Sequence, residues 1–219
     1  MKINKISDIQ KLVVDGFEDW LQYGQVYTKM KGNLVLFNYL PQAQFNNNWT
    51  FLERVSRGLI IDKVSGEIVA RPFDQFFNWM ENNRQTNAPL KTITEKMDGS
   101  LGILYRDNGL KVATRGSFDG EQAQWATKFL NDNFDLSDLE SHVTLLFEII
   151  YPENKIVIDY GNTHALYLIG ARNRFNGEYV SYIGLRDIGD YYGFPTPKKC
   201  NYNDIQDCTT EKDNRRVLN

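Results

Sequence analysis

Cysteine and histidine are scarce in this chain of 219 residues, because each occurs only twice. Two cysteines, Cys200 and Cys208, cannot cross-link a domain of this size or form a four-ligand zinc site, so we expect a reducing, cytoplasmic environment. No apolar run approaches the roughly 18 residues that a membrane span needs. The first residues lack the continuous apolar segment of a secretory signal, and none is expected there.

The chain also lacks a large excess of positive or negative residues. The chain has 25 Lys and Arg against 28 Asp and Glu, which gives a net charge of −3. This balance does not by itself indicate a nucleic-acid-binding protein, although an acidic protein can carry a local basic groove. With 42% hydrophobic and 13% aromatic residues the chain can bury a core, which excludes intrinsic disorder. The length predicts one domain or one and a half.

Hydrophobic periodicity predicts mostly strands, with few helices. An amphipathic helix with Ser7 as its N-cap opens the chain, and further helices are expected at 120–131 and 185–192. The dipeptide Asn108-Gly109 predicts a tight hairpin. Segments of period two bounded by turn residues predict strands at 34–39, 58–62, 67–71, 92–97, 101–105, 110–114, 144–150, 156–160, 165–171 and 179–182. This order indicates an α+β fold with antiparallel sheets, because helices and strands do not alternate as in βαβ units.

The segment Thr94-Glu95-Lys96-Met97-Asp98-Gly99-Ser100-Leu101 has two interpretations. It can be a hairpin centred on Asp-Gly with a solvated lysine beside it. Alternatively, Lys96 is a nucleophile for the α-phosphate of a nucleotide. A free lysine has a pKa of about 10.4, so such a site must favour the neutral amine by burial, nearby cations or a metal.

Other charged residues sit where strands begin or end. Arg57 begins one predicted strand, and Arg115 lies between another strand and the following helix, where a cation and backbone N–H groups can meet phosphate. Glu148 lies within Leu145-Leu146-Phe147-Glu148-Ile149-Ile150. A carboxylate in such a run is costly unless it is paired or faces a cleft. The alternative is an edge strand with one hydrated face.

Several stretches, taken together and in order, resemble the covalent nucleotidyltransferases, and within them the ATP-dependent RNA ligases of the bacteriophage T4 RNA ligase 1 type. The likeness runs from about Leu34 to Tyr182. The stretches are Phe37-Asn38-Tyr39, Ser56-Arg57-Gly58, Ala70-Arg71-Pro72, Phe76-Phe77-Asn78, Lys96-Met97-Asp98-Gly99-Ser100-Leu101, Arg115-Gly116-Ser117, Phe147-Glu148, Pro152-Glu153-Asn154-Lys155-Ile156-Val157 and Gly177-Glu178-Tyr179-Val180-Ser181-Tyr182.

The resemblance implies an antiparallel-sheet nucleotidyltransferase core (ATP-grasp-like) with flanking helices. It also implies ATP and Mg²⁺ as cofactors, and RNA ends, with broken tRNA as the family's typical case. A cytoplasmic location follows, which is the host cytoplasm if the protein is phage-encoded. Lys96 would form a lysyl-AMP intermediate, pass the AMP to a 5′-phosphate end, and allow a 3′-hydroxyl to seal the strand.

The residue roles that the resemblance implies fall into two groups. The catalytic group is Lys96, Asp98 and Glu148, with Glu148 also near the metal. Asp98 and Gly99 would shape the loop that presents Lys96, and a side chain on Gly99 would crowd that turn. The nucleotide-binding group is Phe37, Arg57, Gln75, Glu95, Gly99 and Arg115.

The sequence departs from the family pattern in two places. Gln75 stands where the family has a lysine, so a phosphate-orienting charge is either missing there or supplied by Arg71 or Arg84. The family's later Glu-Gly and Lys-x-Lys strands do not follow Tyr182, so we expect a core that is incomplete at its C-terminal end. We therefore predict an adenylyltransferase domain at 1–197 and a polar tail at 198–219. The alternatives are a nucleotide- or RNA-binding module without catalysis, or a fragment of a split or decayed ligase.

Overall fold

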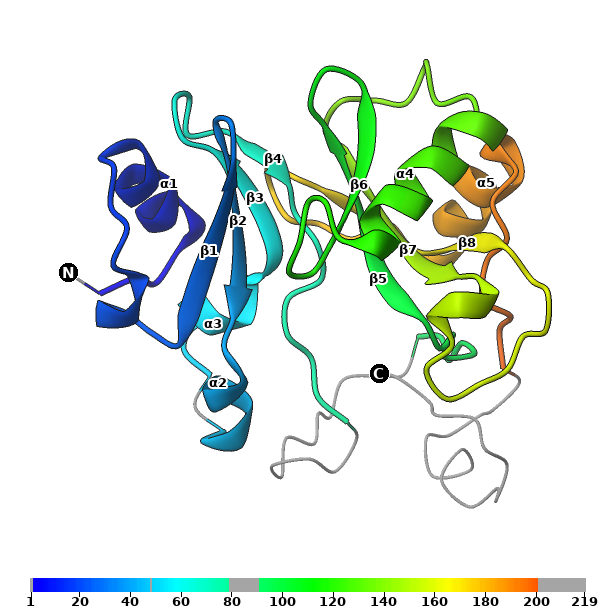
Figure 1. Ribbon diagram of the computed structural model, residues 1–219, viewed down its shortest axis with the longest axis horizontal. Helices are drawn as coiled ribbons and strands as arrows, with labels where there is room; N and C mark the ends of the chain where they lie inside the picture. Colours follow the sequence, from blue (N-terminus) through cyan, green and yellow to red (C-terminus); the bar gives the residue numbers. More distant parts are fainter. Residues whose placement is uncertain (1, 48, 79–90, 201–219) are drawn as a thin grey trace.

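The computed structural model describes residues 2–47, 49–78 and 91–200 and contains two four-stranded antiparallel sheets. The sheets pack against each other, with helix α1 outside the first sheet and helices α4 and α5 on the second (Figure 1). Within the described residues, no helix has both the length and the apolar composition that a membrane span requires.

The first sheet has the strand order β1-β2-β3-β4. Its strands are β1 (Val26–Lys31), β2 (Leu34–Tyr39), β3 (Arg57–Asp62) and β4 (Ile68–Ala70). Helix α1 (Ile6–Val14) precedes it, followed by the short turn η1 (Trp20–Gln22). Helices α2 (Pro41–Phe45) and α3 (Phe51–Val55) connect β2 to β3. The N-cap of α1 is Lys5 and not Ser7 as predicted. The carboxylate of Asp8, in the first turn, accepts hydrogen bonds from the backbone N–H groups of Asn4 and Lys5.

The second sheet has the strand order β6-β5-β7-β8. Its strands are β5 (Ser100–Arg106), β6 (Leu110–Thr114), β7 (Val143–Ile150) and β8 (Ala165–Asn173). Helix α4 (Glu121–Asn133) follows β6, the turn η3 (Pro152–Asn154) follows β7, and helix α5 (Tyr182–Tyr192) follows β8. The predicted hairpin at Asn108-Gly109 is present, and both of its residues have positive φ.

Three apolar layers follow from the alternation of side chains along the strands. In β2, Val35 and Phe37 pack with α1, whereas Leu36 packs toward the second sheet. In β7, Leu146 faces the first sheet, whereas Leu145 and Phe147 pack toward the helices. The α+β class with antiparallel sheets is therefore confirmed.

Three predicted strands are absent as strands. Thr94, in the segment predicted at 92–97, forms a single bridge with Lys199. The predicted strand at 179–182 likewise reduces to one bridge, between Tyr179 and Arg172, before α5 begins. The segment predicted at 156–160 has no strand partner and its apolar side chains are exposed, because its backbone N–H groups bond to a side chain, as described below.

The first residues of the predicted tail pair with the chain just before Lys96. The N–H of Glu95 donates to the carbonyl of Lys198, and the N–H of Cys200 donates to the carbonyl of Ile93, each at 2.9 Å. The predicted tail therefore begins with residues that pair with the predicted domain. The rest of the tail, 201–219, lies outside the described residues.

Candidate active site

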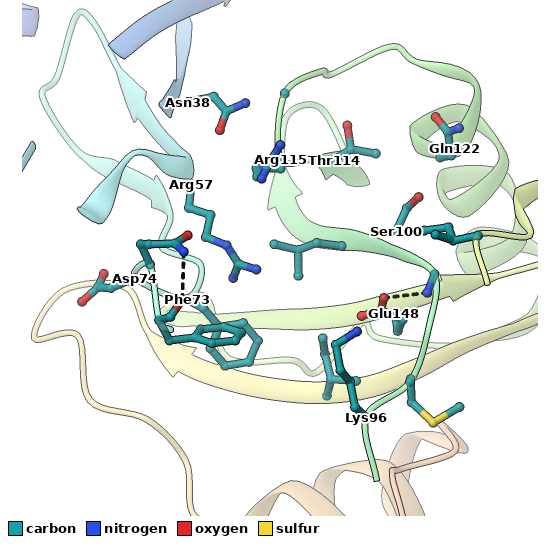
Figure 2. Close-up of a pocket in the computed structure, with 18 of the residues that line it drawn as sticks. Asn38, Arg57, Phe73, Asp74, Lys96, Ser100, Thr114, Arg115, Gln122 and Glu148 are labelled. Carbon is teal, nitrogen blue, oxygen red and sulfur yellow. Dashed lines mark hydrogen bonds between the residues drawn. The ribbon is translucent and has the colours of Figure 1, made fainter. Parts of the chain in front are cut away.

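A cavity of about 1120 Å³ opens between the two sheets. Four predicted site residues from four separate segments line it: Arg57 at the start of β3, Lys96 before β5, Arg115 after β6 and Glu148 in β7. Figure 2 shows the side chains of Arg57, Lys96 and Glu148 pointing toward one space, with Arg115 and Asn38 on its other side. The volume lies at the upper end of the roughly 300–1,000 Å³ typical of small-molecule pockets.

Glu148 reaches the cavity because successive side chains of β7 point to opposite faces of the sheet. It shares a face with Leu146, which packs toward the first sheet, so its carboxylate enters the space between the sheets. Its Oε1 accepts a 2.8 Å hydrogen bond from the backbone N–H of Gly99. Burial raises the pKa of Glu148 to about 7, although the Gly99 N–H, Lys96 and Arg57 act in the opposite direction.

Gly99 brings the Lys96 segment against β7. A Cβ on Gly99 would lie 2.4 Å from the carbonyl oxygen of Ile149 and 3.2 Å from Cγ of Glu148. The requirement for glycine comes from this close approach, and not from a turn. The hairpin interpretation of Asp98-Gly99 is wrong, because β5 begins at Ser100 and pairs directly with β7.

Asp98 is not among the residues that line the main cavity. Its Oδ2 accepts hydrogen bonds from the backbone N–H groups of Val157 at 2.7 Å and Ile158 at 2.8 Å. Its own N–H donates to the hydroxyl of Tyr160 at 2.9 Å. Asp98 therefore fixes the loop beside Lys96, which agrees with a shaping role and places its carboxylate outside the cavity.

The guanidinium of Arg57 has N–H donors that no protein group accepts. Its Cζ lies 4.6 Å from the ring centroid of Phe76, and its Nε and Nη1 atoms are buried without a hydrogen-bond partner. Burial lowers the pKa of Arg57, as does Arg115, whereas Tyr39 and Glu148 raise it. A guanidinium keeps its charge in proteins, so this arrangement favours an anionic ligand such as phosphate.

Arg115 is oriented by the first sheet. Its Nη1 donates to the hydroxyl of Tyr39 at 2.7 Å, and its Cζ lies 4.9 Å from the Tyr39 ring centroid. The next residue, Gly116, passes so close to β1 that a Cβ would lie 2.8 Å from the Tyr27 hydroxyl. The second sheet thus supplies Arg115, and the first sheet fixes its direction.

Phe37 does not line the cavity, and its predicted placement in a nucleotide pocket is wrong. It is fully buried on the α1 side of the first sheet, with its ring centroid 4.7 Å from that of Trp20. The next residue, Asn38, lines the cavity instead. Alternation along the strand puts Leu36 and Asn38 on one face and Phe37 on the other, so the period of two could have indicated that Asn38, and not Phe37, enters the cavity.

Gln75 and Glu95 both line the cavity. The backbone N–H of Gln75 donates to the carbonyl of Arg54 at 2.7 Å, and its Nε2 donates to the carbonyl of Phe76 at 2.8 Å. The side-chain Oε1 of Gln75 is buried without a partner. A hydrogen-bonding group, not a charge, thus occupies this position.

A cation near Gln75 does come from elsewhere in the chain. Arg54 lines the cavity and was missed by sequence reasoning, because nothing in α3 distinguishes it from a surface residue. Arg71 does not line the cavity, since its Nη1 donates to the carbonyl of Phe175 at 3.3 Å. Arg84 lies outside the described residues.

The acidic groups of the cavity fit a divalent cation that has few protein ligands and keeps several waters. Asp74, Glu95 and Glu148 are in its lining, but the described part of the chain holds no cluster of three His, Cys, Asp or Glu side chains suited to a metal. Mg²⁺ usually keeps several waters and binds through one or two carboxylates together with substrate phosphates. Glu148 is suited to that arrangement, and an all-protein cage is not present among these residues.

The fold is similar to that of solved ATP-dependent ligases. An archaeal ATP-dependent RNA ligase structure matches with a TM-score of 0.59 and 16% identity, covering 89% of this chain and 52% of the other. At that identity the likeness shows a shared fold.

The family follows from the sequence comparison. The RNA ligase family model of the T4 RNA ligase 1 type matches residues 55–216, and the chain belongs to this family. A Rhodothermus phage RM378 protein named RNA ligase is 25% identical in an alignment of 193 residues, with 68% of this chain and 43% of that protein covered. RNA ligase 1 of bacteriophage TS2126 is 27% identical in an alignment of 145 residues, with 58% of this chain and 36% of the other covered. The chain thus spans less than half the length of these relatives.

Proposed function

We propose that this chain is the adenylyltransferase domain, predicted at 1–197, of an ATP-dependent RNA ligase. The observation that carries the proposal is the convergence of Arg57, Lys96, Arg115 and Glu148, from four separate segments, on one cavity. Membership of the RNA ligase family supports RNA as the substrate, and the fold shared with ATP-dependent ligases supports ATP.

The chemistry begins at the side chain of Lys96. The neutral ε-amine attacks the α-phosphorus of ATP, forms a P–N bond and displaces pyrophosphate, while one of its two N–H protons is released to solvent. The 5′-phosphate of an RNA end then attacks the same phosphorus and breaks the P–N bond, and the departing nitrogen takes up a proton from solvent to restore the lysine amine. Finally, a 3′-hydroxyl attacks the activated 5′-phosphate, loses its proton, expels AMP and forms the phosphodiester.

The surrounding groups act by position and charge. Arg57 and Arg115 line the cavity and bind phosphate oxygens. Each guanidinium is held in place against an aromatic ring, Phe76 for Arg57 and Tyr39 for Arg115. Gln75 and Glu95, which both line the cavity, contact the nucleotide. Glu148 binds a ribose hydroxyl or a water of the magnesium ion. Bound Mg²⁺ supplies neutralisation of the triphosphate charge.

RNA ends, including broken tRNA, are the proposed second substrate. The cavity lining contains cations from several elements, which are Arg54 from α3, Arg57 from β3, and Lys96 and Arg115 from the segments around the second sheet. Phosphate-tracking contacts of this kind make affinity depend on salt. We also propose that the protein acts in the cytoplasm, where ATP and RNA ends occur together.

The decisive experiment measures the intact mass after incubation with ATP and Mg²⁺. We expect an adduct of one AMP on the wild type and none on Lys96→Ala. The matched control is Lys91→Ala, which removes an exposed lysine five positions earlier in the same segment. An adduct that persists in Lys96→Ala, or that never forms on the wild type, contradicts the proposal.

One observation favours a second function, which is nucleotide or RNA binding without catalysis. Gln75 occupies the position where the family has a lysine, so a phosphate-orienting charge is absent there. This function predicts saturable binding of ATP or RNA with no covalent product. The mass experiment, repeated with a filter-binding measurement of RNA at several salt concentrations, separates the two functions.

A further inference from the structure

The chain from Arg71 to Phe76, here called the strap, links β4 to the cavity wall. It leaves β4 and passes between the two sheets (Figure 1). Pro72 and Asp74 bond to Arg172 of β8, and the residues from Phe73 to Phe76 line the cavity. At its start, the N–H of Arg71 donates to Oγ1 of Thr144 at 3.1 Å. The strap therefore contacts both sheets at the point where the candidate active site opens.

Arg172 of β8 binds the strap with nearly all of its guanidinium. Its side chain is only 4% exposed. It donates to Oδ1 and Oδ2 of Asp74 at 2.8 and 3.2 Å, to the carbonyl of Pro72 at 2.5 Å and to the carbonyl of Gly177 at 2.8 Å. A bidentate arginine–carboxylate pair fixes the direction as well as the position of its partner, which a lysine cannot do.

Aromatic packing adds a second restraint on the same residues. The Tyr179 ring stacks on Phe73 with centroids 5.8 Å apart, and the guanidinium of Arg172 lies 4.4 Å from the Tyr179 centroid. The Tyr179 hydroxyl accepts a 3.2 Å hydrogen bond from the N–H of Asp74. Phe73 packs so closely on Gly170 that a Cβ there would lie 2.3 Å from its ring. Thus β8 and the turn that follows it fix the backbone and the carboxylate of Asp74 and the ring of Phe73.

The far end of the strap contacts Arg57. The N–H of Gln75 donates to the carbonyl of Arg54 at 2.7 Å, which ties the strap back to α3 just before β3. Phe76 follows, and its ring lies under the Arg57 guanidinium at 4.6 Å. The ion pair between the buried Arg172 and the partly exposed Asp74, two residues before Phe76, therefore helps to determine the surface against which Arg57 rests.

We propose that Asp74 and Arg172 are a positioning pair that holds the strap so that Phe76 presents Arg57 to the nucleotide phosphates. This inference rests on the proposed function, because it assigns the pair to the adenylylation step. Neither residue needs to touch the substrate. A displacement of about 1 Å in a positioned catalytic group can cost about 10²-fold in rate, so a change in the strap is sufficient to affect Arg57.

The test is a double-mutant cycle between Asp74→Asn and Arg57→Ala, read as the rate of AMP adduct formation. Asp74→Asn preserves shape and removes the charge that holds Arg172. We expect it to lower the rate about tenfold to a hundredfold in the wild type and by less than about twofold in Arg57→Ala. Phe76→Leu, which leaves the ion pair intact, is the second variant and should show the same non-additivity. Asp107→Asn, which removes the carboxylate paired with Lys111 at the tip of the β5–β6 hairpin, is the control and should leave the rate unchanged.

The outcomes are separable. Equal losses from Asp74→Asn with and without Arg57 would overturn the inference, because Asp74 would then act directly or only through stability. Thermal unfolding of every variant identifies the second case, since a structural role lowers the melting temperature without the coupling to Arg57. If the wild type forms no adduct, the proposed function fails, and the same cycle is measured on ATP binding by calorimetry. Additive effects there, or no ATP binding at all, would also overturn the inference.

Discussion

The backbone N–H of Gly99 donates a 2.8 Å hydrogen bond to Oε1 of Glu148, and this bond joins the Lys96 segment to the middle of β7. It brings together the candidate nucleophile Lys96 and the carboxylate of Glu148, which are separated in the sequence by β5, β6 and α4. The bond forms because Gly99 lacks a side chain and can approach the backbone of Ile149. The geometry of the site thus depends on a glycine for reasons of packing.

Gly99→Ala should disrupt both the fold and the site. The added Cβ would meet the Ile149 carbonyl at 2.4 Å, so the segment must move away from β7 and the hydrogen bond to Glu148 must lengthen. We expect a loss of about 1–3 kcal/mol in the free energy of unfolding and a strong decrease in adduct formation. Chemical denaturation and intact mass measure the two effects.

The control for this change is Gly120→Ala, where a Cβ would find ordinary contacts of 3.4 Å with Ser117. Gly120 is the N-cap of α4, so its replacement should cost less than about 1 kcal/mol and leave adduct formation unchanged. Equal effects of the two substitutions would contradict a packing requirement at Gly99.

Glu148→Gln should change how stability depends on pH. Burial raises the pKa of Glu148 from its ordinary 4.5 to about 7. Between these values the folded protein holds a proton that the unfolded chain has lost, so the free energy of unfolding falls as pH rises through this window. The uncharged glutamine has no such titration. Relative to the wild type, the variant should therefore gain about 2–3 kcal/mol between about pH 5 and pH 8.

Urea unfolding of both proteins across that range measures this difference, and all other titrating groups cancel in the comparison. The same substitution should abolish or severely reduce adduct formation, since the carboxylate is lost from the cavity. A stability difference that is constant with pH would show that Glu148 is already ionised in the folded protein at pH 5.

Asp98→Ala should release the loop at 156–160. Its carboxylate accepts from the N–H groups of Val157 and Ile158, and these exposed apolar residues have no strand partner to hold them. We expect faster hydrogen exchange at the two amides and faster proteolytic cleavage within the loop, because local opening becomes easier. Asp135→Ala, which removes a carboxylate from another surface loop, should leave both rates unchanged.

Faster exchange should be accompanied by slower adduct formation, because Asp98 also connects the loop to the segment of Lys96. If cleavage and exchange in Asp98→Ala match the wild type, the loop is held by other contacts.

The sequence was most informative where local pattern decides structure. Asn108-Gly109 requires two positive φ angles and forms the predicted hairpin, and the α+β class follows from the succession of strands. Lys96, Arg57, Arg115 and Glu148 could be selected because charged residues at strand ends or inside apolar runs need a reason to be there. That they share one cavity depends on how the two sheets pack, which no local pattern specifies.

The errors have a common physical cause, which is tertiary contact. The apolar run at 156–160 has the composition of a strand, but Asp98 takes up its N–H groups and no sheet edge remains for it. Phe37 lies one position away from the side chain that enters the cavity, so a motif could indicate the strand but not its face. The Asp74–Arg172 pair joins residues nearly 100 positions apart and has no sequence signal at all.

Asn154→Ala tests a buried polar link that the motif around it did not identify. Its Nδ2 donates to the carbonyl of Ile149 at 2.8 Å, and its Oδ1 accepts from the hydroxyl of Ser100 at 3.0 Å, so it joins the end of β7 to the start of β5. Alanine leaves both buried groups unpaired, and we expect a loss of about 1–3 kcal/mol in the free energy of unfolding. Asn133→Ala, at an exposed asparagine, should stay within about 0.5 kcal/mol of the wild type. Equal urea midpoints for the two variants would show that the Asn154 link contributes nothing.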